Sequence, residues 1–197
     1  DSQNFLVNGR ATYQWTDNIQ STVRVGYNFI DSRMSNFYPQ GVVASSVRGH
    51  KSLLDRRFST TTIDFTTNWE QPLGDRLVLN TTFGGQSFRE TLKQDRSAVR
   101  VFGSPTLKTL SGGQEITGVS ENYVEVINAG VFAQTQIGLD DRIFLTGGVR
   151  LDGNSAFGSD FGLQAYPKAG VSWVVSDYDF WNVGFIDELR LRGALGM

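Results

Sequence analysis

The sequence predicts an all-β chain that forms a segment of an antiparallel transmembrane β-barrel. Three observations predict this fold: eight stretches of alternating apolar and polar side chains, an apolar face without charge in those stretches, and connections that alternate between short and long. Successive side chains of a strand point to opposite faces, so an alternation with a period of two residues indicates strands.

The eight alternating stretches define the predicted strands. They are Phe5–Trp15, Ile19–Phe29, Ser59–Trp69, Leu77–Ser87, Ala129–Leu139, Ile143–Leu151, Pro167–Val175 and a truncated Leu189–Leu195. Five of them run eleven residues and two run nine. A tilted strand needs about 9–11 residues to cross a bilayer, whereas strands of soluble proteins typically run about 5–6. The lengths therefore favour strands that cross a membrane.

The odd-numbered residues of these stretches form the apolar face, and none of them is Asp, Glu, Lys or Arg. A face without charge suits lipid better than water. The even-numbered residues form the polar face, which is expected to border an aqueous lumen. Its charged members are the candidates for lumen-facing residues, with their substrate contacts unknown: Arg10, Arg24, Asp64, Arg150, Lys168, Arg190 and Arg192.

This polar face carries six cations against a single acid, Asp64. One hypothesis is that the cations line the passage and meet anionic groups of a substrate or of another part of the protein. The alternative is pairing with neighbouring strands or loops, or solvation, which is the usual state of a charge on a wet face. The sequence favours this alternative.

Aromatic residues on the apolar face predict the two membrane interfaces. Trp15, Trp69 and Trp173 each lie within a few residues of a short or intermediate connection, while Tyr27 and Phe29 close the opposite end of their strand. Trp and Tyr favour the membrane–water boundary because their rings are amphipathic. The alternative is three ordinary core tryptophans.

The connections orient the chain, because outer-membrane barrels have short periplasmic turns and longer extracellular loops. The short connections are Thr16–Asn18, Glu70–Arg76 and Asp140–Arg142, with an intermediate one at Ser176–Asp187. The long connections are Ile30–Phe58 and Phe88–Tyr123, with a shorter one at Asp152–Tyr166. The three tryptophans are thus expected at the periplasmic rim, and Arg33, His50 and Arg96 in loops outside the cell.

Composition excludes several classes of protein. Hydrophobic residues make up 39% and charged residues 19% of the 197 residues, which excludes a disordered chain. The net charge of −2 gives no support for binding nucleic acid. No apolar run approaches the length of a transmembrane helix, and the absence of cysteine excludes a disulfide framework. Any membrane crossing must therefore use strands.

The two ends of the chain predict that it is part of a larger barrel. Asp1 opens directly into a strand without a signal sequence, and Met197 ends the chain a few residues into the eighth predicted strand. Because the last strand is too short to pair along its whole length with the first, eight strands would leave an unpaired edge in lipid, which is prohibitively costly. Residues 1–197 are thus expected to be a partial barrel domain.

Three motifs in the second half resemble the SusC/RagA family of TonB-linked outer-membrane transporters. In that family a strand ends at an acidic–basic turn, and the next strand leads into an R-x-D-G-S-S-x-F-G-like loop. A strand that begins with Y/F-P and ends in Ala/Gly-x-Trp comes next. An L-K/R-L-R-x-S-aromatic-G strand follows it. The matching residues are Asp141, Arg142, Arg150, Asp152, Gly153, Ser155, Phe157, Gly158, Tyr166, Pro167, Gly170, Trp173, Leu189, Leu191, Arg192 and Gly196. The departures are Ile143, Asn154, Lys168 and Ala194–Leu195. The match covers about a third of the chain.

This resemblance implies a barrel of 22 strands in the bacterial outer membrane, filled by an N-terminal plug and opened by energy from TonB. It implies import of oligosaccharides, glycans or peptides. No enzymatic activity and no cofactor are expected. The implied partners are outer-membrane lipid, a SusD-like surface lipoprotein, and the TonB complex through an N-terminal part that residues 1–197 lack. The plug and the C-terminal end of the barrel are likewise expected to be absent from these residues.

The residues that suggest other chemistry are few. His50 is the only histidine, and no nucleophile and acid stand around it at a recognisable spacing, so no catalytic residue is predicted. Asp152, Gly153 and Asn154 with Asp160 lack the alternating oxygen ligands and closing Glu of an EF-hand, so a turn with Asx hydrogen bonds is expected and no metal site.

Three other functions remain open at this point. A soluble secreted β-sandwich would bind carbohydrate through aromatic loops such as Phe37–Tyr38. A passive outer-membrane porin would share the strand pattern. A barrel enzyme such as a lipase or protease would need a nucleophile paired with His50.

Overall fold

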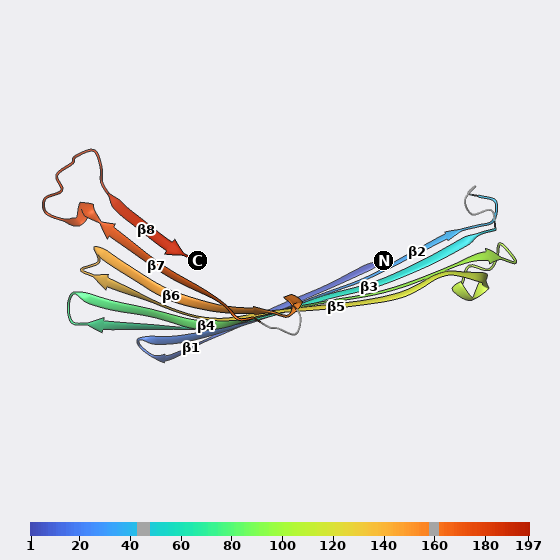
Figure 1. Ribbon diagram of the computed structural model, residues 1–197, viewed down its shortest axis with the longest axis horizontal. Coiled ribbons are helices and arrows are strands. Elements are labelled where there is room, and N and C mark those ends of the chain that lie inside the picture. The colour runs from blue at the N-terminus through green and yellow to red at the C-terminus, as the bar shows by residue number, and fades with distance from the viewer. Residues whose placement is uncertain (43–47, 158–161) are drawn as a thin grey trace. The chain divides into compact units, whose positions relative to one another are not determined.

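The computed structural model describes residues 1–42, 48–157 and 162–197. These residues form one eight-stranded antiparallel sheet in which the order of the strands follows the chain, from β1 to β8 (Figure 1). The strands are β1 (Ser2–Thr16), β2 (Ile19–Tyr38), β3 (His50–Leu73), β4 (Leu77–Phe102), β5 (Gly113–Leu139), β6 (Ile143–Asn154), β7 (Gln164–Val174) and β8 (Arg190–Gly196). The connections within these described residues also contain the short 3₁₀ helices η2 (Leu110–Gly112), η3 (Ser155–Phe157) and η4 (Val175–Asp177).

The chain divides into two compact units. Unit 1 comprises Asp1–Val7, Gly26–Thr61 and Arg89–Val126, and unit 2 comprises Asn8–Val25, Thr62–Phe88 and Ile127–Met197.

Unit 2 contains the short turns at one end of its strands (Figure 1). The β5–β6 turn has φ of 53° at Asp140 and 56° at Asp141, and the N–H of Arg142 donates to the carbonyl of Leu139 over 3.0 Å. Two central residues with positive φ and this hydrogen bond define a type I′ turn, whose twist matches that of the flanking strands.

Adjacent turns of unit 2 are joined to one another. The N–H of Asp140 donates to the carbonyl of Arg76 over 2.7 Å, and the Nε of Arg76 donates to Oδ1 of Asp140, also over 2.7 Å. Arg76 ends the β3–β4 turn, so a backbone and a side-chain hydrogen bond link that turn to the β5–β6 turn.

The strand pairing in unit 2 confirms the two faces predicted from alternation. Phe132 of β5 lies opposite Arg150 of β6, which lies opposite Tyr166 of β7, so the three share the polar face. In the same registers Ala133 lies opposite Val149 and Val149 opposite Pro167, all on the apolar face.

The apolar face of unit 2 is uncovered in the structure. Val23, Phe65 and Val149 are 38%, 40% and 42% exposed, and Trp15, Trp69, Leu145, Val171, Trp173 and Leu191 are exposed as well. In a β-sandwich such residues pack against a second sheet. The described residues instead place them on the surface of a single sheet, as a lipid-facing wall requires.

Small polar groups on this apolar face satisfy one another. The indole N–H of Trp15 donates to the hydroxyl of Ser21 over 2.9 Å, and that hydroxyl lies 2.8 Å from the hydroxyl of Thr67. Ser21 and Thr67 are buried. The pairing matters because a polar group without a partner in an apolar surrounding costs several kcal/mol in lipid.

In unit 1 the prediction of two long loops is wrong, because most of the residues concerned form strands. Ile30–Phe58 was expected as a loop, but β2 continues to Tyr38 and β3 begins at His50; likewise Phe88–Tyr123 was expected as a loop, but β4 continues to Phe102 and β5 begins at Gly113. Arg33, His50 and Arg96 therefore lie on strands. The prediction failed because it treated a face without charge as the mark of a strand.

Charged residues form the ladder that replaces this apolar face in unit 1. Beyond Tyr27 and Phe29 on β2, the next odd-numbered residues are Asp31 and Arg33, which form ion pairs with β3: Arg57 Nε lies 3.9 Å from Asp31 and Arg33 Nε lies 3.4 Å from Asp55. We call these two ion pairs, together with the three pairs between β4 and β5 that are described next, the ion-pair ladder.

Strands β4 and β5 continue the ladder. Arg89 Nη2 lies 2.6 Å from Glu125, Lys93 Nζ lies 3.2 Å from Glu121, and a further pair joins Arg100 and Glu115 over 2.7 Å. The hydroxyl of Tyr123 also donates to Glu125. The hydrogen bonds from Arg89 and Tyr123 hold the pKa of the Glu125 carboxyl below its usual value.

A small buried core lies in unit 1. Phe102 is 1% exposed, Ala98, Val99 and Val101 are also buried, and the ring of Phe37 meets Phe102 edge to face at 5.3 Å. The Phe102 carbonyl also accepts a hydrogen bond from the amide of Gln40. This core fastens the ends of β2 and β4 to each other.

The remaining strand limits differ by a few residues from the prediction. β6 extends to Asn154, β7 begins at Gln164 and ends at Val174, and β8 begins at Arg190. Val175, predicted to end a strand, instead begins η4, where its N–H donates to the carbonyl of Leu189 over 2.8 Å. None of the helices in the described residues has the length and apolar character needed to cross a bilayer.

Candidate functional site on the polar face

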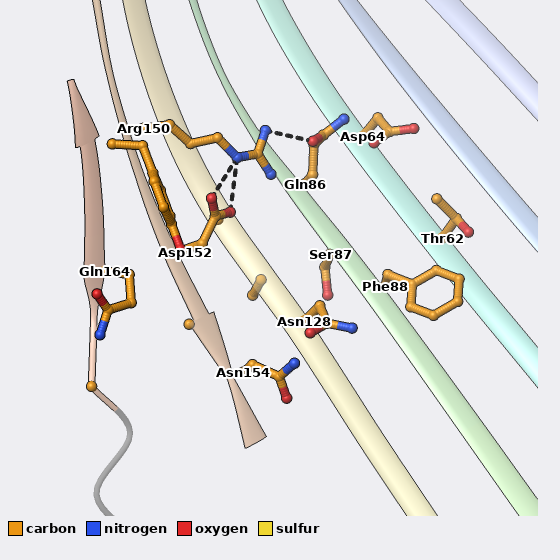
Figure 2. Close-up of a pocket in the computed structure, with 15 residues that line it drawn as sticks. Thr62, Asp64, Gln86, Ser87, Phe88, Asn128, Arg150, Asp152, Asn154 and Gln164 are labelled. Atoms are coloured by element: carbon orange, nitrogen blue, oxygen red, sulfur yellow. Dashed lines mark hydrogen bonds and ion pairs between the residues drawn. The ribbon is translucent and has the colours of Figure 1, made fainter. Parts of the chain in front are cut away.

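Two adjacent depressions lie on the polar face of unit 2, and each has a volume of about 460 Å³. The first, which we call the outer depression, is shown in Figure 2. Its polar lining is rich in amides and hydroxyls and includes two acids and one cation: Thr62, Asp64, Gln86, Ser87, Asn128, Arg150, Asp152, Asn154, Gln164 and Tyr166.

Arg150 is the centre of this site. Its Nε donates to both carboxylate oxygens of Asp152 over 2.9 and 2.6 Å, and its Nη1 donates to the amide oxygen of Gln86 over 2.8 Å (Figure 2). Its guanidinium carbon lies 5.9 Å from the centre of the Phe132 ring, within range of a cation–π contact. These contacts from β4, β5 and β6 hold the guanidinium in one position.

Glycines make room for this arrangement. A Cβ at Gly130, directly opposite Asp152, would collide with the Asp152 carboxylate. A Cβ at Gly84 would lie 2.9 Å from the ring of Phe132 and would also meet the Phe65 carbonyl. Glycine in a strand interior often marks such a close approach, and here it lets an aromatic ring and an ion pair lie flat on the polar face.

The second depression, which we call the inner depression, shares Gln86, Arg150 and Tyr166 with the first. It adds Phe132, Gln134 and Lys168 from β5 and β7, and its remaining lining is Thr82, Ala133, Val149, Pro167, Gly196 and Met197. The stem of Lys168 lies over Gly148 on the opposite strand, where an added Cβ would come within 3.1 Å of Lys168 Cε. Arg150 therefore stands between the two depressions.

The structure brings together three of the seven candidate polar-face residues. Asp64 and Arg150 line the outer depression, and Arg150 and Lys168 line the inner one. Arg10, Arg24, Arg190 and Arg192 line neither depression. Arg190 is paired with Glu188 over 3.0 Å.

Sequence reasoning missed Asp152 as a member of this face. The predicted strand ended at Leu151, whereas β6 continues to Asn154 and so carries Asp152 onto the face of Arg150. Two of the six cations, Arg150 and Arg190, thus have carboxylate partners. The even spacing of Arg150 and Asp152 was the signal that could have found the pair.

The connection after β6 is a turn held by side chains. The N–H of Ala156 donates to the amide oxygen of Asn154 over 2.7 Å, and the N–H of Ile127 donates to the hydroxyl of Ser155 over 2.8 Å. The first bond is the Asx hydrogen bond expected here. Gly158 and Asp160 lie outside the described residues. Within the described ranges no group of acidic, histidine or cysteine residues is arranged to hold a metal ion.

His50 is the first residue of β3, and its ring stacks on Tyr38 with centroids 6.3 Å apart. The predicted interface aromatics divide between the units: Trp15, Trp69 and Trp173 belong to unit 2, and Tyr27 and Phe29 to unit 1. The three tryptophans are exposed on the apolar face.

Solved structures share this fold. The chain superposes on a structure described as the RagAB peptide transporter with a TM-score of 0.91 and 18% identity, over 99% of this chain and 22% of that chain. The RagAB peptide importer gives TM-scores of 0.89 in the "open-open" state and 0.91 in the "closed-closed" state, at the same identity and coverage. The chain spans about a fifth of the length of these proteins. No curated protein matches the sequence.

The family model described as "TonB dependent receptor-like, beta-barrel" matches residues 1–197, the whole chain. Together with the single sheet, its uncovered apolar face and its polar face, this match agrees with the family resemblance of the three motifs. The chain belongs to the TonB-dependent receptor-like β-barrel family.

Proposed function

We propose that this chain forms eight strands of the barrel wall of a TonB-dependent importer in the bacterial outer membrane. The observation that carries the proposal is the uncovered apolar face of unit 2, whose large side chains are exposed and which carries no charge over the predicted strands. Such a face is stable against acyl chains and would aggregate in water. Family membership supplies the class of transporter.

The imported substrate is an oligosaccharide, another glycan or a peptide. The polar face supports a polar substrate of this kind, because the outer depression offers amide groups, hydroxyls and the Arg150–Asp152 pair beside the aromatic ring of Tyr166. The proteins of similar fold are described as peptide transporters, which supports a peptide among these substrates. A SusD-like lipoprotein at the outer surface and the TonB complex, reached through another part of the full-length protein, complete the proposed assembly.

The orientation rests on the short turns between β1 and β2, between β3 and β4, and between β5 and β6. The short turns of unit 2 face the periplasm, with Trp15, Trp69 and Trp173 at that interface. Tyr27 and Phe29, the last aromatic residues before Asp31 on the odd-numbered side of β2, mark the outer interface. Aromatic girdles at both interfaces are typical of outer-membrane barrels.

The test uses the full-length protein that contains this chain. Cells carrying it should concentrate the protein in the outer-membrane fraction, where detergent is needed to release it, and should lose uptake of the substrate when either the gene or TonB is deleted. Release into the soluble fraction without detergent would overturn the membrane assignment. Uptake that persists without TonB would instead favour a passive porin.

A further inference from the structure

We propose that the inner depression binds a carboxylate group of the substrate, with Lys168 and Arg150 as its cationic ligands. This inference rests on the proposed import function and names the chemistry that the lumen selects. It concerns one functional group, which both an acidic sugar and a peptide C-terminus carry.

The charge of the lining carries the argument. The described residues that line the inner depression include two cations, Arg150 and Lys168, and no acid. The outer depression differs, because it is lined by both Asp64 and Asp152. Because Arg150 is already paired with Asp152, the charge left in the outer depression is the negative one of Asp64, and the charge left in the inner depression is the positive one of Lys168. An anion is therefore attracted to the inner depression.

Donor groups remain available on both cations. Arg150 uses Nε for Asp152 and one Nη1 hydrogen for Gln86, whereas its Nη2 has no partner among the described residues. The side chain of Lys168 makes no ion pair or hydrogen bond with any residue that the structure describes. A guanidinium and an ammonium together carry eight N–H donors, so unused donors face the depression.

The spacing of the two cations fits a carboxylate between them. Lys168 lies opposite Gly148 and Arg150 lies opposite Tyr166, so the two cations are diagonal neighbours on one face. Diagonal neighbours of antiparallel strands lie about 7–8 Å apart, and long side chains span this distance with a bridging anion between their ends. The Asp152–Gln86 clamp fixes Arg150, which lowers the entropy lost when the anion binds.

Neighbouring groups support the same ligand. Gln86 and Gln134 offer amide donors in the depression, and the rings of Phe132 and Tyr166 offer flat surfaces for the body of the substrate. An anion paired with charged donors is bound more tightly than a neutral group, since hydrogen bonds to charged groups are stronger than those between neutral groups.

The experiment compares acidic and neutral probes on purified full-length protein in detergent. Isothermal titration measures the binding of trigalacturonate against galactotriose, and of pentaalanine against pentaalanine amide. The wild-type protein is expected to bind the acidic member of at least one pair about tenfold more tightly, the factor that one charge-assisted hydrogen bond supplies. The pair that shows the preference identifies a sugar acid or a peptide terminus as its source.

Variants assign the preference to the depression. Lys168→Gln should abolish it and Lys168→Arg should retain it, while Arg24→Gln, which removes a cation of the polar face outside both depressions, should leave it unchanged. Heat-modified gel migration checks that each variant is folded. A preference that survives in Lys168→Gln, or its absence from both wild-type pairs, overturns the inference.

This outcome is separable from the test of import. TonB-dependent uptake without any acid preference removes only the carboxylate site. An acid preference that depends on Lys168, in a protein whose uptake needs no TonB, removes only the proposed energy coupling.

Discussion

The odd-numbered side of the strands differs between the two units. In unit 2 it presents exposed apolar side chains such as Val23, Phe65 and Val149, and no charge occurs on it within the predicted strands. In unit 1 the same alternation continues on β2 with Asp31 and Arg33, which pair with Arg57 and Asp55 of β3. The backbone geometry is that of a strand in both units, but the surface chemistry is opposite.

This difference shows that an alternation with a period of two residues indicates a strand. Whether the alternating residues are charged or apolar indicates whether that part of the strand borders water or lipid. β3, β4 and β5 run 24, 26 and 27 residues, whereas about 9–11 residues suffice to cross a bilayer. The surplus belongs to unit 1, where cross-strand ion pairs replace lipid contact. We interpret the change from Phe29 to Asp31 as the edge of the hydrocarbon region.

The largest expected effect comes from removing Phe102 from the buried core of unit 1. Phe102→Ala should destabilise this unit by about 3–5 kcal/mol, the cost of truncating a fully buried Phe. Limited proteolysis of the full-length protein in membranes should then cut within 89–126 while the strands of unit 2 stay protected.

Phe5→Ala is the matched control, since Phe5 belongs to the same unit but is exposed. Equal cleavage of both variants would show that unit 1 does not depend on its core and would remove this part of the contrast.

A smaller effect is expected from placing a charge on the apolar side of unit 2. Phe65→Arg should cost about 2–4 kcal/mol, the range for Arg near the bilayer midplane on a lipid-facing strand. Urea unfolding of the full-length protein in lipid vesicles measures this loss. Thr66→Arg, on the neighbouring residue of the polar face, should change stability far less because the new charge stays in water. Equal losses would mean that Phe65 does not face lipid.

The smallest effect concerns the ion-pair ladder of unit 1. The pKa of Glu125 is lowered chiefly by the hydrogen bond from Arg89. The pair therefore stabilises the folded state fully above the ordinary pKa of Glu, which is about 4.3. This stabilisation is lost as the pH falls through the lowered pKa of Glu125. Carbon NMR of the labelled Glu125 carboxyl should show titration below the ordinary range, and Arg89→Gln should return it. A titration that is the same with and without Arg89 would contradict the ladder.

Much of the fold was predictable because lipid imposes a strict pattern. The segments that lipid borders, such as Ile19–Phe29 and Leu77–Ser87, were found with their faces assigned, since no charge is tolerated on one side. The continuations to Tyr38 and Phe102 were missed because water permits charged residues on a strand, so their composition resembles that of a loop. Only partners across the sheet, such as Glu125 for Arg89, reveal them as strands.

The candidate site was predictable in part for the same reason. Alternation identified Arg150 and Lys168 as members of one polar face, which the registers of β6 and β7 confirm. It did not show that Asp152 clamps Arg150, nor that Arg10 and Arg24 lie outside the depressions. These facts depend on where a strand ends and on which strands become neighbours, and neither follows from a local pattern.

The hydrogen bonds between Arg76 and Asp140 have a consequence for the alignment of β4 and β5. A shift of β5 by one residue relative to β4 would turn Val131 toward the aqueous side and Gln134 toward lipid. The backbone and side-chain hydrogen bonds between Arg76 and Asp140 form in only one register of the two strands. These turns therefore oppose slippage of the strands, and Asp140 serves both purposes: it adopts the left-handed conformation of the turn and supplies the carboxylate that Arg76 binds.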